Sequence, residues 1–389
     1  MKAVRLIRPV GIGESKTEIP VKLYQGATPM RIVRTNETSM PSSKPCIAHR
    51  SPSKVHATTL VASLVFLICG GWSPARAAGP ALWIASSANS GVTGAVGGLI
   101  ELRPGQLTKS GVPQQVVITE SSPPLVDAAG VAFQGGNVWV TTLDNTLLKF
   151  TSTQLKKLSK DPLPTPTATI TSSSFMFILS CLFDAHGNLW IVDPEADGVH
   201  EISHAQLASA SGDITLTPTV TITDTTDLAS PAFAAFDKGG NLWISSEGSA
   251  KIVEFTASQL ASSGALTPKV IISSSSLNDP GQLAFDSAGN LWVTNAFTST
   301  VVKFTRTQLT SSGSPVAPVV LSDDGSGSLS TPWGLQFDSL HRLWVFNYTT
   351  GTISKFDTRE LKASGSPVPQ VFLTGLPLYA AQITFGPSY

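Results

Sequence analysis

The chain has 389 residues, 26 basic and 26 acidic side chains, and a formal net charge of zero. Counting on either side of Ala77 separates a basic leader, with 11 basic and 3 acidic side chains, from an acidic body with 15 and 23. The acidic body disfavours a nucleic-acid-binding surface. Cys181 is the only cysteine after residue 77, which excludes an intrachain disulfide in that part of the chain.

Residues 40–77 have the anatomy of an export signal. Basic residues precede an apolar run over residues 60–71, and Ala75 and Ala77 then match the small-residue rule for cleavage. The run is about twelve residues long, whereas a membrane-spanning helix needs roughly twenty. We therefore predict cleavage after Ala77, no remaining membrane span, and a secreted, periplasmic or cell-envelope location.

Residues 1–39 match no part of an export signal, and Met40 would begin its charged region. We therefore hypothesise that translation starts at Met40 and that residues 1–39 are a misassigned extension. Cys69 raises lipidation as a minor alternative, although Ile68 stands where a lipidation signal prefers a small residue. Detection of a peptide from residues 1–39 by mass spectrometry would contradict the later start.

From residue 78 onward the chain is built from a degenerate repeat of about fifty residues. The segment FDSAGNLWVTN (285–295) returns in similar form from Phe183, Phe236 and Phe337, and more weakly from Phe133. The tryptophans of the repeat are spaced by 56, 51, 53, 49 and 52 residues. Six copies at this period predict a six-bladed β-propeller over residues 78–389. The tryptophan column consists of Trp83, Trp139, Trp190, Trp243, Trp292 and Trp344.

Each copy predicts four strands and a short helical turn. Apolar residues on either side of a turn rich in Gly and Asn indicate an inner β-hairpin. A third strand, such as TVVKF (300–304), is followed by Thr-x-x-Gln, a capping box that begins one or two helical turns. We expect the glycine of the Ser-Gly pair that follows to act as the C-terminal cap of these turns. Only RPGQL (103–107) departs from the capping box, and an extended segment such as APVVLS (317–322) makes the fourth strand.

The two ends of the repeat region are complementary. Trp83 has no phenylalanine before it, and Phe385 has no tryptophan after it, so the phenylalanine column is one copy out of step. We therefore predict that AAQITF (380–385) completes the blade begun by ALWIAS (81–86), which closes the ring and pairs both exposed edges. The Trp and Phe columns should form the core between neighbouring blades.

These hairpins resemble those of two related groups, the NHL-repeat propellers and the streptogramin B lyase-like (virginiamycin B lyase-like) propellers, over roughly residues 78–389. The resemblance implies an all-β, six-bladed propeller of four-stranded blades. The lyase resemblance also implies a metal with histidine and glutamate as base and ligand, but that arrangement is not recognisable here. The Glu, Asn and Asp ligands of gluconolactonase-like propellers are not matched either. The repeated motif builds blades and predicts no particular activity.

Small polar residues close the second strand of every copy. We expect them to ring the mouth of the central channel. Such residues commonly end strands by hydrogen-bonding their own backbone. The alternative interpretation is a ring of side chains that recognises a ligand. Under that alternative, Asn295 and Asn347 are candidate ligand-binding residues. The column is Ser86, Thr142, Asp193, Ser246, Asn295 and Asn347.

The densest acidic cluster is DPEADG (193–198). Asp193, Glu195 and Asp197 alternate before a glycine, as at the start of a calcium loop. The twelfth position would be His204 instead of a bidentate glutamate, so a solvated acidic turn is the alternative. Glu247, in the matching loop of the next copy, could join a shared site. We hypothesise a calcium or magnesium ion at this cluster, although the sequence makes no cofactor certain.

A few further residues carry chemical interest. Trp333 and Tyr348 lie near loops of the sixth copy, where exposed aromatic rings could stack on a sugar or on a partner's side chain. Core packing is the alternative for Trp333. We expect His200 and His204 to be separate surface histidines, and Cys181 to be a buried thiol.

The sequence therefore predicts an exported β-propeller that acts as a binding or protein-interaction scaffold, with a protein or a carbohydrate as its ligand and a monomeric state. No convergent set of acid, base and nucleophile is visible. The alternative is a metal-dependent lyase or lactone hydrolase of the streptogramin lyase or gluconolactonase type. That enzyme would work from Asp193, Glu195, Asp197, Glu247 and Asn295, whose side chains would have to converge within a few ångströms.

Overall fold

A computed structural model describes most of the chain after residue 78. The described residues are 79–87, 97–118, 125, 127–158, 164–224, 226–378 and 380–389, together with two short strands nearer the N-terminus. The chain divides into two units, Met1–Gly71 and Trp72–Tyr389. In the first unit, β1 (Val4–Arg5) pairs antiparallel with β2 (Pro20–Val21). The predicted export signal, its cleavage site and the start at Met40 lie outside the described residues.

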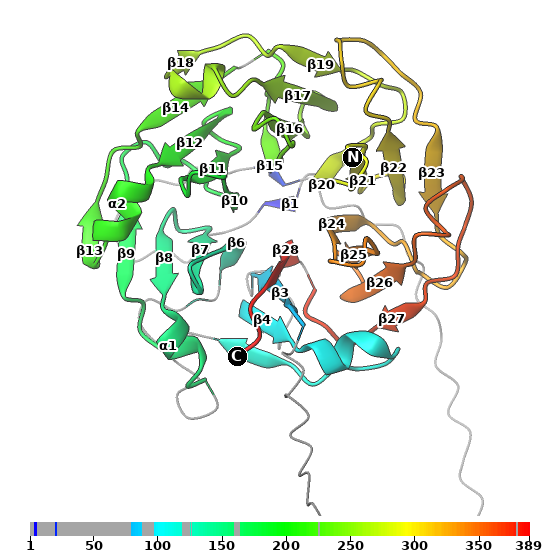
Figure 1. Cartoon of the computed structure of the whole chain (residues 1–389), viewed down its shortest axis with the longest axis horizontal. Helices are drawn as coiled ribbons and strands as arrows, with labels where there is room; N and C mark the ends of the chain where they lie inside the picture. Colours follow the sequence, from blue (N-terminus) through cyan, green and yellow to red (C-terminus); the bar gives the residue numbers. More distant parts are fainter. Residues whose placement is uncertain are drawn as a thin grey trace, which may run out of the picture. The chain divides into compact units, whose positions relative to one another are not determined.

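The second unit contains six sheets, each with four consecutive antiparallel strands, arranged around a common centre (Figure 1). This confirms the predicted six-bladed β-propeller. From the centre outward, blade 1 has β28 (Ala380–Gly386), β3 (Ala81–Ser86), β4 (Gly98–Leu102) and β5 (Val116–Ile118); blade 2 has β6 (Ala128–Gln134), β7 (Asn137–Thr142), β8 (Leu147–Phe150) and β9 (Ala168–Thr171); blade 3 has β10 (Ser180–Phe183), β11 (Leu189–Asp193), β12 (Gly198–Ile202) and β14 (Val220–Thr223).

The other three blades follow the same order. Blade 4 has β15 (Pro231–Phe236), β16 (Leu242–Ser246), β17 (Lys251–Phe255) and β19 (Val270–Ile272); blade 5 has β20 (Pro280–Phe285), β21 (Leu291–Asn295), β22 (Thr300–Phe304) and β23 (Val319–Ser322); blade 6 has β24 (Pro332–Phe337), β25 (Leu343–Asn347), β26 (Thr352–Phe356) and β27 (Val371–Leu373).

The ring is closed by the last strand, as predicted. β28 pairs antiparallel with β3, with Phe385 opposite Leu82 and Gly386 opposite Ala81. The two strands lie side by side in blade 1 although they come from opposite ends of the repeat region (Figure 1). Phe385 also contacts Trp344 of blade 6, with ring centroids 6.0 Å apart. The C-terminal strand thus joins the first blade to the last.

The Asp-x-x-Gly-Asn-Leu-Trp motif is a hydrogen-bonded unit, best seen in blade 5. Asp286 Oδ1 accepts the backbone N–H groups of Ala288 and Asn290, both at 2.9 Å. Asp286 Oδ2 accepts from Asn290 Nδ2 at 2.8 Å and from Trp292 Nε1 at 3.1 Å. Asn290 Oδ1 accepts the N–H of Arg306 at the helical turn (3.1 Å). The motif therefore fixes the hairpin, the tryptophan and the next turn together.

Replacing Asp286 by Asn is expected to destabilise the propeller by about 1–3 kcal/mol at neutral pH, because an amide nitrogen would face two donors. Burial would raise the pKa of Asp286, but the hydrogen bonds from Asn290, Trp292 and Ala288 outweigh it and lower the pKa. The stabilisation is thus present above the carboxyl's unfolded pKa and is lost as pH falls through the lower folded value.

Denaturant unfolding of the Asp286→Asn variant at pH 7 and pH 3 measures both effects, and the difference from the parent protein should shrink at pH 3. Asp213→Asn is the matched control, since Asp213 is exposed and lies outside the motif. Equal stability of Asp286→Asn and Asp213→Asn at pH 7 would contradict this role of the motif.

Short helical turns follow the third strands, as predicted. In blade 2, Thr151 Oγ1 accepts the N–H of Gln154 (3.4 Å) while Gln154 Oε1 accepts the N–H of Thr151 (2.8 Å), a reciprocal capping box. In blade 1, which lacks the motif, the N–H of Arg103 still donates to Gln106 Oε1 at 2.8 Å. The helical elements are η1 (Pro104–Thr108), α1 (Ser152–Leu155), α2 (His204–Ser209) and η2 (Gln259–Ala261).

The prediction that the Ser-Gly glycines cap these turns was wrong. The C-caps are Lys109, Ala210 and Ser262, and the glycines lie farther along the chain. There they pair in parallel with the outer strand of the preceding blade. β13 (Gly212–Thr215) extends β9 and β18 (Gly264–Ala265) extends β14, while single bridges join Gly111 to Leu373, Gly313 to Ile272 and Gly365 to Leu321. The serine and glycine thus cover the outer sheet edges.

Ser312 carries one such contact, because the backbone N–H of Ile271 donates to its Oγ at 3.0 Å. Replacing Ser312 by Ala is expected to lower the free energy of unfolding by about 0.5–1 kcal/mol, the value of one exposed hydrogen bond. Denaturant unfolding against the exposed neighbour variant Ser311→Ala measures this difference. A loss of equal size in both variants would show that the hydroxyl of Ser312 has no special role.

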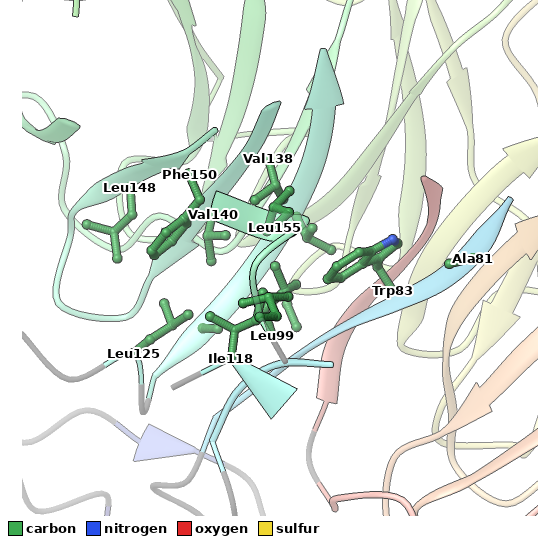
Figure 2. Close-up of a cluster of buried hydrophobic side chains, with 14 residues drawn as sticks. Ala81, Trp83, Leu99, Ile118, Leu125, Val138, Val140, Leu148, Phe150 and Leu155 are labelled. Atoms are coloured by element: carbon green, nitrogen blue, oxygen red, sulfur yellow. The ribbon is translucent and has the colours of Figure 1, made fainter. Parts of the chain in front are cut away.

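The tryptophan column forms the core between blades, as predicted, but the phenylalanine column is only partly buried. All six tryptophans are at most 2% exposed. In blade 1, Trp83 packs with Leu99 and Ile118 against Val138 and Leu155 of blade 2 (Figure 2). The six phenylalanines are each half-buried. Five of them meet the tryptophan of the preceding blade, with ring centroids 5.3–6.3 Å apart.

Candidate functional site

The two ends of the propeller are formed by different connecting segments. The loops between second and third strands and the links between blades share one end, here called the loop face. The hairpin turns between first and second strands and the helical turns share the other, here called the turn face. All the site residues predicted from the sequence come from segments at the loop face.

Asn295 and Asn347 lie at the ends of β21 and β25, and both are fully buried. Asn295 Oδ1 accepts the N–H of Asn278 (3.1 Å), while its Nδ2 donates to Ser276 O (2.8 Å) and Thr300 Oγ1 (3.2 Å). Asn347 makes the equivalent three bonds in blade 6, with Ser330, Ser328 and Thr352. Both amides therefore tie the link between blades to the end of the second strand.

Asp193 occupies the same position in blade 3 and is also fully buried. Its Oδ1 accepts the N–H groups of Phe177 (2.9 Å) and Ala196 (3.1 Å), and its Oδ2 accepts that of Met176 (2.7 Å). Burial would raise the pKa of this carboxyl, but its contacts with His200 and with the backbone N–H groups outweigh burial and lower the pKa. The carboxylate is thus held charged by the backbone of the preceding link.

His200 was expected at the surface, but this prediction was wrong, because His200 is buried next to Asp193. Its side chain is about 1% exposed, and its Nε2 lies 3.5 Å from Asp193 Oδ2 without a hydrogen bond. Its Nδ1 lies 3.0 Å from Thr221 Oγ1. His204, in contrast, is exposed as expected. Cys181 is buried, also as expected, and burial raises the pKa of its thiol to about 12.

The acidic residues proposed for a cation do not converge. Glu195 and Glu247 are exposed, whereas Asp193 is buried. Asp197 has a positive φ of 45° and its Oδ1 accepts the N–H of Ser230 at 2.8 Å. Within the described part of the chain, no group of three or more His, Cys, Asp and Glu side chains is placed to hold a metal ion. Two of these carboxylates, those of Asp193 and Asp197, instead bind backbone N–H groups of the links before and after blade 3.

Trp333 and Tyr348 do come together. The half-buried Trp333 ring lies 5.9 Å from the half-buried Tyr348 ring and 5.5 Å, edge-on, from Phe233 of blade 4. Trp333 reaches across blade 5 because Gly281 has no side chain; a Cβ there would lie 3.2 Å from Trp333 Cε3. The three rings form an aromatic cluster at the loop face.

Three segments around this aromatic cluster carry no charged side chain. Segments 296–299, 328–333 and 348–351 contain no acidic or basic residue. Thr349 Oγ1 donates to Thr331 Oγ1 at 3.2 Å, and the N–H of Thr331 donates to Ser299 Oγ at 3.1 Å. Phe297 lies in the neighbouring loop and is 52% exposed. We call Phe297, Trp333, Tyr348 and these hydroxyl groups the aromatic platform.

Two glutamines that were not singled out from the sequence cross the centre of the propeller. Gln382 Oε1 in blade 1 accepts the N–H groups of Val131 (3.0 Å) and Cys181 (3.2 Å), and its Nε2 donates to Cys181 O at 3.0 Å. Gln282 in blade 5 bonds in the same way to Leu335 of blade 6 and Ile383 of blade 1. The sequence does mark these two glutamines. Each is a polar residue within an otherwise apolar first strand, three residues before the phenylalanine of its copy.

The chain is similar in structure to known propellers. A chain of the nidogen/laminin complex has a TM-score of 0.51 at 13% identity, covering 79% of this chain and 98% of that one. The two chains therefore share their fold. Virginiamycin B lyase from Staphylococcus aureus has a TM-score of 0.42 at 15% identity, covering 60% of this chain and 67% of the lyase.

A third similar structure is assigned as a 6-phosphogluconolactonase from Bacteroides uniformis, with a TM-score of 0.45 at 12% identity, covering 72% of this chain and 78% of that one. No protein-family model and no curated protein sequence matches the chain. Among the described residues, no helix has both the length and the apolar character needed to cross a membrane.

Proposed function

We propose that this chain is an exported binding propeller whose ligand site is the aromatic platform, and that a neutral carbohydrate is the ligand. The supporting observation is a half-buried Trp333 ring held by Phe233 and Tyr348. Aromatic rings with fixed orientation offer a large apolar surface at low entropic cost. The export part of the proposal depends on the signal-like segment 40–77.

The chemistry of the aromatic platform favours an uncharged ligand with many hydroxyl groups. The hydroxyls of Ser299, Thr331 and Thr349 can each donate or accept a hydrogen bond, which suits the hydroxyl groups of a sugar. No charged residue lies in the three segments that form the platform, so an ionic ligand would be desolvated without a compensating charge. A protein partner with a neutral surface is the competing occupant.

Replacing Trp333 by Ala is expected to weaken oligosaccharide binding by tenfold or more, because the central ring of the platform is removed. Titration of a panel of neutral oligosaccharides against the full chain, followed by calorimetry, measures the affinity. Leu340→Ala is the matched control, since Leu340 is 62% exposed in the hairpin turn of the same blade, at the turn face.

Two outcomes would contradict the carbohydrate proposal. One is equal affinity of Trp333→Ala and Leu340→Ala for an oligosaccharide that binds. The other is absence of oligosaccharide binding together with capture of a protein partner that depends on Trp333, which would keep the surface but replace the ligand.

The metal-dependent lyase or lactone hydrolase remains a second candidate with weaker support. It requires Asp193, Glu195, Asp197, Glu247 and Asn295 to act together, and their described positions do not bring them into one site. Both oxygens of the fully buried Asp193 already accept backbone N–H groups, so a cation would have to share this carboxylate with them. These residues do not fit the ligand set that the lyase resemblance implies.

A further inference from the structure

The centre of the propeller contains a cavity of about 430 Å³, separate from the aromatic platform. It is formed by the ends of the first strands that approach the turn face. Cavities of roughly 300–1,000 Å³ are typical of small-molecule sites. The cavity is therefore large enough for a compact organic ligand.

The walls of the cavity are aromatic and held in place. Each of the lining phenylalanines is half-buried, so part of its ring faces the cavity. Four of them are braced from behind by the tryptophan of the preceding blade. A site with rings already fixed loses little conformational entropy when a ligand binds. The lining rings are Phe133, Phe183, Phe236, Phe285 and Phe385.

The polar groups of the cavity are few and uncharged. Gln282 and Gln382 each donate one Nε2 hydrogen to a backbone carbonyl, which leaves a second hydrogen with no acceptor among the described residues. Gln336 accepts from the N–H of Phe337, and both Gln336 and Thr384, whose side chains carry an amide and a hydroxyl donor, line the cavity. Among the residues that the structure describes, no acidic or basic side chain lines it. The cavity thus offers hydrogen-bond donors inside an apolar wall.

We propose that this central cavity binds a neutral aromatic or alicyclic small molecule that carries one hydrogen-bond acceptor, such as a carbonyl oxygen. The aromatic walls contact the ring of the ligand, and an amide or hydroxyl donor of Gln336, Thr384 or the crossing glutamines meets its acceptor. A charged ligand is excluded because its charge would lose water without gaining a partner. The site does not depend on the aromatic platform or on its ligand.

The experiment compares benzamide with benzoate, two probes of similar size of which only benzoate is charged. Saturation-transfer NMR with the full chain is expected to show transfer to benzamide that saturates on titration, and at least tenfold weaker binding of benzoate. Ala235→Leu fills the cavity and is expected to abolish the benzamide signal. Ala257→Leu makes the same change at an exposed position after β17 and should leave the signal intact.

A second variant, Thr384→Val, tests the same proposal if Ala235→Leu does not fold. Thr384→Val preserves the shape of the side chain and removes a donor, and about three- to tenfold weaker benzamide binding is expected. The proposal is overturned if benzamide gives no saturable signal, if benzoate binds equally well, or if neither folded variant weakens binding. Trp333→Ala should leave benzamide binding unchanged, which separates this site from the proposed carbohydrate site.

Discussion

Removal of residues 380–389 is expected to prevent stable folding of the propeller. The deletion takes away β28, which supplies the inner strand of blade 1 and the buried side chains of Gln382 and Ile383. It exposes the edge of β3 and removes the contact of Phe385 with Trp344. Loss of these apolar side chains and hydrogen bonds together is expected to cost more than about 5 kcal/mol, comparable with the total stability of many domains.

Circular dichroism and size-exclusion chromatography of the truncated chain measure this effect. Deletion of residues 387–389 alone is the control, because it leaves β28 complete. It removes the hydrogen bond from Trp83 Nε1 to Pro387 O, the bonds of Ser388 and Tyr389 to Glu101 and Gly136, and the ring contact of Tyr389 with Trp83. A synthetic peptide of residues 380–389 should restore the truncated chain by adding the missing strand. A cooperative thermal transition of the truncated chain near that of the parent would refute the closure argument.

Replacing Gln382 by Leu is expected to lower the free energy of unfolding by about 2–5 kcal/mol. Leucine has a similar volume but leaves the N–H groups of Val131 and Cys181 and the carbonyl of Cys181 without their partner. Each buried unpaired group costs about 1–3 kcal/mol. The loss of stability should be large because the Gln382 side chain, in blade 1, hydrogen-bonds to both blade 2 and blade 3.

Gln336→Leu is the control for this prediction, since Gln336 is half-buried and, among the described residues, accepts only from the N–H of its neighbour Phe337. Chemical denaturation of both variants gives the two free energies, and the Gln382 variant should be clearly the less stable. If the two variants agree within about 0.5 kcal/mol, the bonds across the centre contribute nothing measurable beyond ordinary surface substitutions.

The blade itself could be predicted because its defining bonds are local. Asp286 bonds to residues two, four and six positions away, and Asn290 reaches sixteen positions to the helical turn. Thr305 and Gln308 bond across three residues. Interactions of this range leave a repeated pattern in the sequence. The unpaired Phe385 and Trp83 at the two ends of the repeat also predicted the closure of the ring, which the structure confirms.

The candidate site was predicted less well, because its geometry depends on residues far apart in the chain. Asn295 and Asn347 were expected at a channel mouth, but links from 17 and 19 positions upstream cover them. His200 was expected at the surface and is buried between Phe175 and Asp193. Trp333 and Tyr348 were named from the sequence, but the contact of Trp333 with Phe233, about 100 positions away, was not.

The amino-acid sequence by itself determined the number of blades, the hairpin motif, the capping boxes and the strand that closes the ring, because these follow from periodicity and short-range hydrogen bonds. Only the tertiary structure decided where the polar residues point. Gln382 bonds to residues 201 and 251 positions away, and the Ser-Gly pairs bond to another blade. Such partners are chosen by the packing of six blades around one axis, and no local pattern of residues encodes that choice.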